Sequence, residues 1–226
     1  MEKRVIVTGS NGLLGKVTSD FLKVNKWEVL EVDLQLGHDL TDEKFVIDWF
    51  SKNNAYGLVN LFALNDNIAI QRKSANLFDI SLDSFDRYLK LNLTALFSVC
   101  REFAKNNNKG SIVNFTSIYG QVSPIPKLYS NDQKHIGYGV SKAGVIQLTR
   151  HLATHLAPTI RVNCILPGGI KQNQNQDFID NYSEFTPLQR MGEPKEIPGM
   201  VEFLLSDNST YCTGGLYPID GGWTSW

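Results

Sequence analysis

The chain of 226 residues has few of the features that would place it at a membrane or in an oxidising compartment. It has no apolar run of the roughly 20 residues that a membrane-spanning helix needs, and residues 1–8 lack the apolar stretch of a signal peptide. The three cysteines, Cys100, Cys164 and Cys212, are odd in number and form no C-x-x-C pair. We therefore expect buried thiols in a reducing compartment, in a cytoplasmic protein without a membrane partner.

The chain also lacks an excess of charge and a metal-binding pattern. With 22 basic and 23 acidic residues its formal net charge is −1, which implies no basic surface for a nucleic-acid backbone. His151 and His155 are four residues apart, but no Glu or Cys completes a zinc pattern beside them. We expect a small-molecule substrate, no nucleic-acid partner and no metal, with both histidines at the surface.

Strand and helix patterns alternate along the chain. Short apolar segments between turn residues predict strands at residues 5–7, 27–33, 57–61, 111–116, 160–166 and 216–219. Apolar residues at helical spacing predict helices from Leu13, from Thr41 as N-cap, from Ser81 with Leu82 on the apolar stripe, over residues 138–156, and after Glu196. This alternation predicts the α/β class, a single domain over residues 1–226. Its core would be a Rossmann-like, doubly wound parallel sheet with helices on both faces.

Three glycines lie between the first predicted strand and the first predicted helix. Gly9, Gly12 and Gly15 would let the backbone turn tightly and approach a pyrophosphate beside the free N–H groups of a helix N-terminus. Asp33 ends the second predicted strand, where a carboxylate binds an adenosine ribose and repels a 2′-phosphate. No Arg or Lys follows Asp33 in residues 34–38. The pattern predicts a dinucleotide site that favours NAD over NADP. The purely structural alternative is that Asp33 only forms a turn.

Tyr138 and Lys142 are the residues that most directly indicate chemistry. A spacing of four places both side chains on one helix face. A nearby ammonium favours the ionised phenol, so we expect Lys142 to lower the pKa of Tyr138 and make it a proton donor and acceptor near neutral pH. The spacing alone could arise by chance, so its weight depends on the surrounding motifs.

In order along nearly the whole chain, the motifs resemble those of the short-chain dehydrogenase/reductase family. The similar segments are residues 8–15, 39–40, 91–93, 112–117, 138–142, 161–168, 187–190 and 213–222. The resemblance implies cofactor contacts at Gly9, Asn11, Gly12, Leu13, Leu14, Gly15, Asp33, Asp39, Leu40, Tyr138, Lys142, Pro167, Gly168 and Ile170.

The resemblance also implies catalytic roles. Tyr138 would be the general acid/base, Lys142 would lower its pKa and bind the nicotinamide ribose, and Ser117 would hydrogen-bond the substrate oxygen. Asn92 would hold a water or a backbone group in a proton relay. The implied reaction is hydride transfer between NAD and a secondary alcohol or ketone. The helix from Ser81 and the helix of Tyr138 resemble the family's association surfaces, which implies a homodimer or homotetramer.

The chain departs from the family pattern in ways that concern the substrate. The spacing of Gly12 is that of the family's extended members. Ser117 and Tyr138 lie 21 residues apart (138 − 117), so residues 121–137 should form an enlarged loop over the catalytic Tyr. The combination also resembles proteins of bacterial surface-glycan and flagellin-sugar pathways, which implies carbohydrate biosynthesis.

Three segments, residues 66–80, 121–137 and 171–187, should form polar loops around the substrate. Their basic residues favour a sugar-like, phosphorylated or nucleotide-linked substrate over a steroid or acyl chain, unless they are ordinary solvated charges: Arg72, Lys73, Lys127, Lys134 and Lys171.

Two other functions stay open. An epimerase or dehydratase with tightly held NAD would use the same Tyr138 and fits the glycine spacing, although only 84 residues (226 − 142) follow Lys142. A non-catalytic NAD-binding protein would not need the complete set of four candidate catalytic residues.

Overall fold

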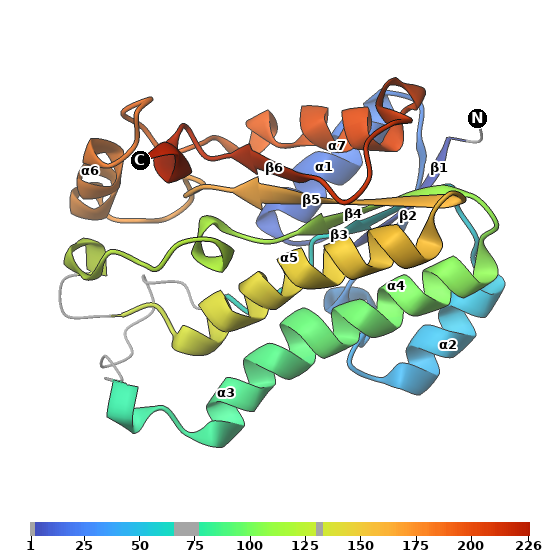
Figure 1. Cartoon of the computed structure of the whole chain (residues 1–226), viewed down its shortest axis with the longest axis horizontal. Helices are drawn as coiled ribbons and strands as arrows, with labels where there is room; N and C mark the ends of the chain where they lie inside the picture. Colours follow the sequence, from blue (N-terminus) through green and yellow to red (C-terminus); the bar gives the residue numbers. More distant parts are fainter. Residues whose placement is uncertain (1–2, 66–76, 130–132) are drawn as a thin grey trace.

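The computed structural model describes residues 3–65, 77–129 and 133–226, which form a parallel sheet flanked by helices (Figure 1). The six strands in these ranges have the order β2-β1-β3-β4-β5-β6, and each neighbouring pair is parallel. The predicted fold class is confirmed. The strands are β1 (Arg4–Thr8), β2 (Glu28–Val32), β3 (Gly57–Asn60), β4 (Gly110–Phe115), β5 (Ile160–Pro167) and β6 (Leu216–Ile219). The helices are α1 (Leu13–Val24), α2 (Glu43–Lys52), α3 (Leu82–Leu89), α4 (Ala95–Asn106), α5 (Ile136–Leu156), α6 (Gln176–Glu184) and α7 (Pro198–Leu205).

Each face of the sheet has its own apolar core, because successive side chains of a strand point to opposite faces. In β1, Ile6 packs in the core beneath α2, α4 and α5, whereas Val5 and Val7 pack in the core beneath α1 and α7. Figure 1 shows these two groups of helices on opposite sides of the sheet. Since both faces are covered, the central strands read as nearly continuous apolar runs in the sequence.

The strand order reverses beside β1. The chain runs from β1 to β2 on one side and then to β3 on the other, and parallel α/β sheets bind ligands at the carboxyl ends of the strands next to such a switch point. At that end Figure 1 shows α6 beyond β5 and β6. A third buried cluster gathers there: Ile118, Leu128, Tyr129, Leu166, Phe178, Tyr182, Met191 and Trp223. We call it the third core.

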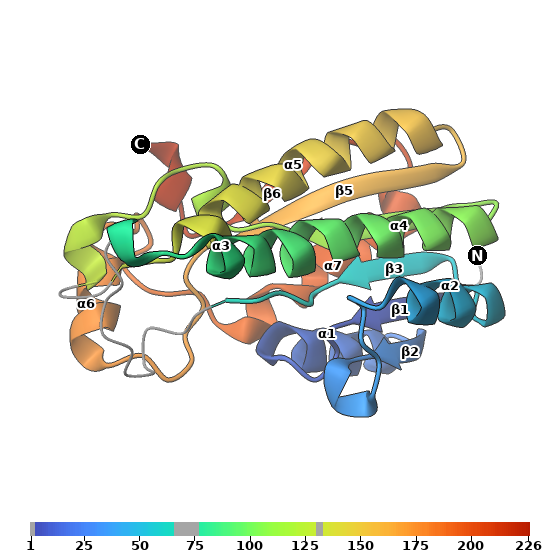
Figure 2. The same cartoon turned by 90° about the horizontal axis from the view of Figure 1, so that it is seen from below.

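A π-helical turn divides the long helix made of α3 and α4, which runs alongside α5 (Figure 2). As predicted, Ser81 caps its start, accepting a hydrogen bond from the N–H of Ser84 at 3.1 Å. The π-turn spans Lys90–Thr94 and contains the buried Asn92. Such turns occur often at functional sites. The prediction that Leu82 lies on the buried stripe is wrong, because its side chain is 81% exposed.

Two other local predictions are wrong. Asp42, not Thr41, caps α2 and accepts hydrogen bonds from the N–H groups of Lys44 and Phe45, because the hydroxyl of Thr41 donates to Asp39 at 2.7 Å instead. Residues 171–187 are not a loop throughout, since they contain α6. Its N-cap is Asn175, whose Oδ1 accepts a hydrogen bond from the N–H of Phe178 at 2.8 Å.

The connection after β2 is a short loop with one 3-10 turn, Leu34–Leu36, and α5 begins two residues before the predicted start. Cys100 and Cys164 are buried free thiols, as expected, and Cys212 is half-buried. Within the described ranges, no helix has the length and apolar composition needed to cross a membrane.

Candidate active site

The turn after β1 requires glycine at two positions. Gly9 has a φ of +69°, and a Cβ there would lie 2.5 Å from the backbone nitrogen of Phe62. A Cβ on Gly15 would lie 2.0 Å from the carbonyl oxygen of Gly9. A side chain at either position would therefore push the helix away from the strands. This close approach of backbone to backbone is what a phosphate-binding turn needs.

The N-terminus of α1 faces a cavity. Gly12 is the N-cap and has no side chain to accept the first N–H groups, and no acidic residue lies in the first turn. Gly12, Leu13, Leu14 and Gly15 all line the cavity. Free N–H groups and the partial positive charge of a helix N-terminus favour an anion. This end of the site therefore fits the pyrophosphate of a dinucleotide.

Asp33 connects the end of β2 to the glycine turn. Its Oδ2 accepts from the N–H of Asn11 at 3.0 Å, and its Oδ1 accepts from the N–H of Gln35 at 2.9 Å. Each carboxylate oxygen has two acceptor sites, so this structural role is compatible with a ribose contact. Asp39 is exposed, and hydrogen bonds from Thr41 hold its pKa below the usual value. Leu40 next to it is buried.

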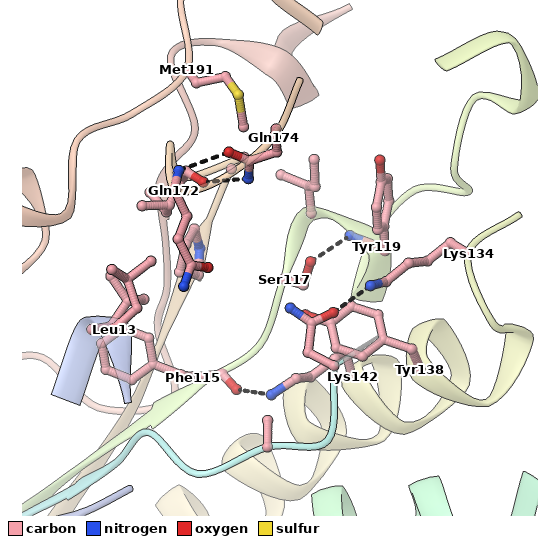
Figure 3. Close-up of a pocket in the computed structure, with 18 of the residues that line it drawn as sticks. Leu13, Phe115, Ser117, Tyr119, Lys134, Tyr138, Lys142, Gln172, Gln174 and Met191 are labelled. Atoms are coloured by element: carbon pink, nitrogen blue, oxygen red, sulfur yellow. Dashed lines mark hydrogen bonds between the residues drawn. The ribbon is translucent and has the colours of Figure 1, made fainter. Parts of the chain in front are cut away.

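A cavity of 520 Å³ extends from the glycine turn to the N-terminal part of α5 (Figure 3). It brings together candidate residues from distant parts of the sequence: Gly12, Leu13, Leu14, Gly15, Ser117, Tyr138, Lys142, Pro167, Gly168 and Ile170. The other candidates, which do not line it, are Gly9, Asn11, Asp33, Asp39, Leu40 and Asn92. The cavity thus joins a phosphate-binding end to a group of titratable side chains.

Tyr138 lies in this cavity with only 7% of its surface exposed. Burial raises the pKa of Tyr138 to about 12, and a hydrogen bond with Ser117 acts in the opposite direction. The expectation that Lys142 lowers this pKa is not met here. The ammonium of Lys142 lies 5.9 Å from the centre of the phenol ring, and it donates to the carbonyl oxygen of Phe115 at 2.9 Å.

Lys142 is a buried amine, 4% exposed. Burial lowers the pKa of Lys142 to about 8, because water no longer solvates the charged form. Its position is fixed through the backbone as well, since the hydroxyl of Thr116 donates to the carbonyl oxygen of Lys142 at 2.6 Å. The end of β4 therefore holds the lysine by both its side chain and its main chain.

Asn92 holds the chain after β3 against α5. Its Oδ1 accepts from the N–H of Leu64 at 2.7 Å, and its Nδ2 donates to the carbonyl oxygen of Leu64 at 3.0 Å. Nδ2 also donates to the hydroxyl of Ser141 at 3.0 Å. The side chain is thus bound to a backbone group, one of the two options predicted for it, and it does not line the cavity.

The opposite side of the cavity carries aromatic and amide side chains, most of them within the predicted substrate segments 121–137 and 171–187, although none of them was singled out from the sequence. They are Tyr119, Tyr129, Phe178, Tyr182, Gln172, Asn173 and Gln174. The amide of Gln174 is braced across the backbone, accepting from the N–H of Gln172 at 2.7 Å and donating to Ile170 at 3.0 Å (Figure 3). The spacing of four between Phe178 and Tyr182 was the one available signal.

The basic residues expected around the substrate contribute little to the described lining. Lys134 lines the cavity, with its amine 4.5 Å from the centre of the Tyr138 ring. Lys127 and Lys171 are exposed, while Arg72 and Lys73 lie outside the described residues. His151 and His155 are at the surface, as predicted. Within the described ranges, no group of three or more His, Cys, Asp or Glu side chains is placed to hold a metal ion.

Comparison with known proteins finds relatives that are all named as reductases or dehydrogenases. A family model described as enoyl-(acyl carrier protein) reductase matches residues 18–224. The chain is 30% identical to 3-oxoacyl-(acyl-carrier-protein) reductase FabG of Aquifex aeolicus, over 96% of this chain and 86% of that protein. It is 28% identical to D-arabinitol 2-dehydrogenase (ribulose-forming) of Scheffersomyces stipitis, over 98% and 93%. The structure of a short-chain dehydrogenase from Leptospira borgpetersenii with bound NAD+ has a TM-score of 0.87 at 31% identity, covering 99% of this chain and 93% of that one.

Proposed function

Because the chain belongs to the short-chain dehydrogenase/reductase family, we propose that it is an NAD-dependent oxidoreductase with Tyr138 as general acid/base. Its substrate is a polar secondary alcohol or the corresponding ketone. One observation carries the proposal: Ser117, Tyr138 and Lys142 share one cavity with the glycine turn. In this proposal the cofactor and substrate sites belong to a single domain over residues 1–226.

The chemistry assigns a separate role to each residue. Bound NAD supplies the hydride acceptor for alcohol oxidation, or the donor for the reverse reaction. Ser117 donates to the reacting oxygen, where negative charge develops. Tyr138, protonated because burial raises its pKa to about 12, donates a proton to the reacting oxygen during reduction, and its phenolate takes the hydroxyl proton during oxidation. Lys142 holds a positive charge beside this site below its pKa of about 8, and Asn92 fixes the wall between β3 and α5.

NAD is the proposed cofactor, with NADP as the alternative. The carboxylate of Asp33 is bound to the glycine turn through Asn11 at 3.0 Å, so its negative charge is fixed beside the dinucleotide site. Repulsion between this carboxylate and a 2′-phosphate favours NAD.

The side chains of the cavity support a sugar-like substrate. Amides of Gln172, Asn173 and Gln174 supply both donors and acceptors, which match several hydroxyl groups better than an acyl chain. The aromatic rings across the cavity offer faces for the C–H groups of a sugar ring. The similarity to an arabinitol dehydrogenase supports the same class. Participation in surface-glycan or flagellin-sugar synthesis is a narrower prediction from the sequence.

An epimerase or dehydratase is the second candidate, because the Gly12 spacing resembles that of extended family members. Such an enzyme would regenerate its NAD in each cycle, so net NADH formation from an alcohol would exclude it. The complete set of Asn92, Ser117, Tyr138 and Lys142 supports catalysis over a non-catalytic binding role.

We also propose a homodimer or homotetramer in the cytoplasm. Exposed apolar side chains on α4 and α5 support association: Phe97 is 44% exposed and Val140 is 45% exposed. A clean monomer by light scattering at micromolar concentration would refute the oligomer.

The decisive test is a screen of NADH formation, measured by absorbance, from polyols, sugars, sugar acids and sugar phosphates. Tyr138→Phe should reduce kcat by roughly 100- to 10,000-fold, the usual contribution of a general acid/base. The variant should still bind NAD, which cofactor fluorescence titration would show. A Tyr138→Phe protein with wild-type turnover would contradict the proposal. Tyr211→Phe, at a fully exposed tyrosine, is the matched control.

A further inference from the structure

Part of the enlarged segment before Tyr138 belongs to the third core. Its 3-10 turn, Pro126–Tyr129, buries Leu128 and Tyr129, which are 3% and 4% exposed. The ring of Tyr129 lies 5.9 Å from that of Phe178 on α6. Tyr129 at the end of this 3-10 turn is therefore both packed in the third core and part of the cavity wall.

The hydroxyl of Tyr129 is directed to a second phenol. It donates to the hydroxyl oxygen of Tyr119 at 2.5 Å, and both residues line the cavity. Tyr119 lies two residues after Ser117, and its N–H donates to the Ser117 hydroxyl at 3.2 Å. Since the Tyr119 oxygen accepts the proton of Tyr129, its own O–H is left to donate to another acceptor.

Both phenols are neutral donors under working conditions. Burial raises the pKa of Tyr119 and of Tyr129 above the usual value of 10.0. A chain of two hydroxyl groups is polarised in one direction, which strengthens the final donor. A site with a buried donor discriminates against a ligand that leaves it unpaired.

We propose that the Tyr119–Tyr129 hydroxyl pair determines substrate specificity by donating, through Tyr119, to a second oxygen of the substrate besides the reacting one. Tyr119 contacts the substrate, and Tyr129 acts as a positioning residue through Tyr119. This inference rests on the proposed function, and it narrows the substrate class to vicinal diols, polyols and hydroxyketones over simple alcohols of the same skeleton.

The test compares cyclohexane-1,2-diol with cyclohexanol, which differ by one hydroxyl group. Binding to the NAD-loaded protein is measured by ligand-observed NMR titration, and turnover is measured as NADH formation. The wild type should bind the diol more tightly. Tyr119→Phe and Tyr129→Phe should each weaken diol binding by about fivefold, the typical net effect of one hydrogen bond, and leave cyclohexanol binding unchanged.

Phenylalanine preserves each ring, so the packing of the third core is retained, and a thermal melt of each variant checks the fold. A purely structural role would change the binding of both alcohols equally, whereas a specificity role changes their ratio. Tyr211→Phe should leave the ratio at its wild-type value. A ratio unchanged in Tyr119→Phe, or a wild type that does not prefer the diol, overturns the inference.

The binding and turnover measurements separate the two proposals. A diol preference in binding that Tyr119→Phe removes, without NADH formation by the wild type, supports the specificity role and contradicts the oxidoreductase. NADH formation at the same rate from both alcohols supports the oxidoreductase and contradicts the specificity role.

Discussion

The two sides of the cavity differ in what they contribute to stability. On the catalytic side, Lys142 is a buried amine with a lowered pKa, and Gly15 packs where no Cβ would fit. On the aromatic side, rings from distant segments stack in the third core, with Tyr182 and Trp223 only 4.3 Å apart. Burying an amine opposes folding, whereas burying aromatic rings favours it. The reactive side therefore depends on the aromatic side for its stability.

The strongest test of this contrast is Trp223→Ala. The Trp223 ring is buried and stacks on Tyr182 at an interplanar angle of 14°. Its removal should reduce the free energy of unfolding by about 3–5 kcal/mol and raise KM for the substrate, with little change in NAD affinity. Urea denaturation measures the first effect. Trp226→Ala, at a residue that is 79% exposed, is the control, and equal losses in both variants would contradict the contrast.

Lys142→Met should increase the free energy of unfolding, in contrast to Trp223→Ala, and it should abolish activity. The folded-state pKa falls from 10.5 to about 8, so the unfolded chain binds more protons between these values and wild-type stability rises with pH across this window. Below pH 8 the variant should be more stable than the wild type by about 3 kcal/mol, since each pKa unit corresponds to about 1.4 kcal/mol.

The difference between Lys142→Met and the wild type should shrink as pH rises from 8 to 10.5. Denaturant titrations at pH 7, 9 and 10.5 measure it. The exposed Lys109→Met should show no such trend. A Lys142→Met protein less stable than the wild type at pH 7 would show that the amine contributes to folding.

Gly15→Ala tests whether the catalytic side tolerates any added volume. The new Cβ would lie 2.0 Å from the Gly9 oxygen, so the turn must shift, at roughly 1–3 kcal/mol of stability. NAD binding should weaken as the turn opens, while the third core keeps its packing. NADH titration measures the loss of cofactor binding, and near-ultraviolet circular dichroism shows whether the third core keeps its packing.

The control for Gly15→Ala is Gly199→Ala on α7, where no atom lies within 4 Å of the new Cβ. There the substitution should increase the free energy of unfolding by up to about 1 kcal/mol, because alanine is the better helix former. Unchanged NAD affinity in Gly15→Ala would mean that the turn is less constrained than its geometry indicates.

The smallest expected effect is a change of cofactor preference in Asp33→Ser. Two charges about 4 Å apart interact by about 1 kcal/mol when water screens them, so removing the carboxylate should improve NADPH binding relative to NADH by about fivefold. Fluorescence titration with both cofactors measures the ratio. Asp20→Ser, at an exposed position of α1, should leave the ratio of NADPH to NADH affinity unchanged. An unchanged ratio in Asp33→Ser would mean that Asp33 only holds the turn through Asn11 and does not select the cofactor.

The positions of the candidate catalytic residues could be predicted from sequence because local chain geometry determines them. Gly9 and Gly15 are needed for one turn, and Tyr138 and Lys142 share one helix face, so the spacing of residues carries the information. The parallel sheet with helices on both faces followed from the alternation of strands and helices, whereas the order of the strands did not. The burial of Tyr138, in contrast, depends on long-range packing, and it raises the pKa of Tyr138 where the sequence predicted a lowered value.

The aromatic side could not be predicted because its contacts are long-range. Tyr129, Phe178 and Trp223 come from three segments that are ordinary in sequence, and each becomes part of a wall only beside the other two. Lys127 and Lys171 looked informative but are exposed. Charges in a sequence indicate the polarity of a surface, but they do not show which side chains face a cavity.

The π-turn at Lys90–Thr94 has a consequence for insertions and deletions. An extra residue in a helical turn changes the phase of everything before it by about 100°, the rotation per residue of an α-helix. Counting back from the buried Leu96 and Phe103 at 3.6 residues per turn leads to Leu82, yet Tyr88 is the buried side chain of α3 and Leu82 is exposed. Deletion of one residue within the turn would restore an uninterrupted α-helix. Because the π-turn already takes up the extra residue, this deletion would keep Tyr88 in phase with Leu96 and Phe103. Inserting a further residue into α3 after Tyr88 would instead rotate the part before it by about 100° and take Tyr88 out of the interior.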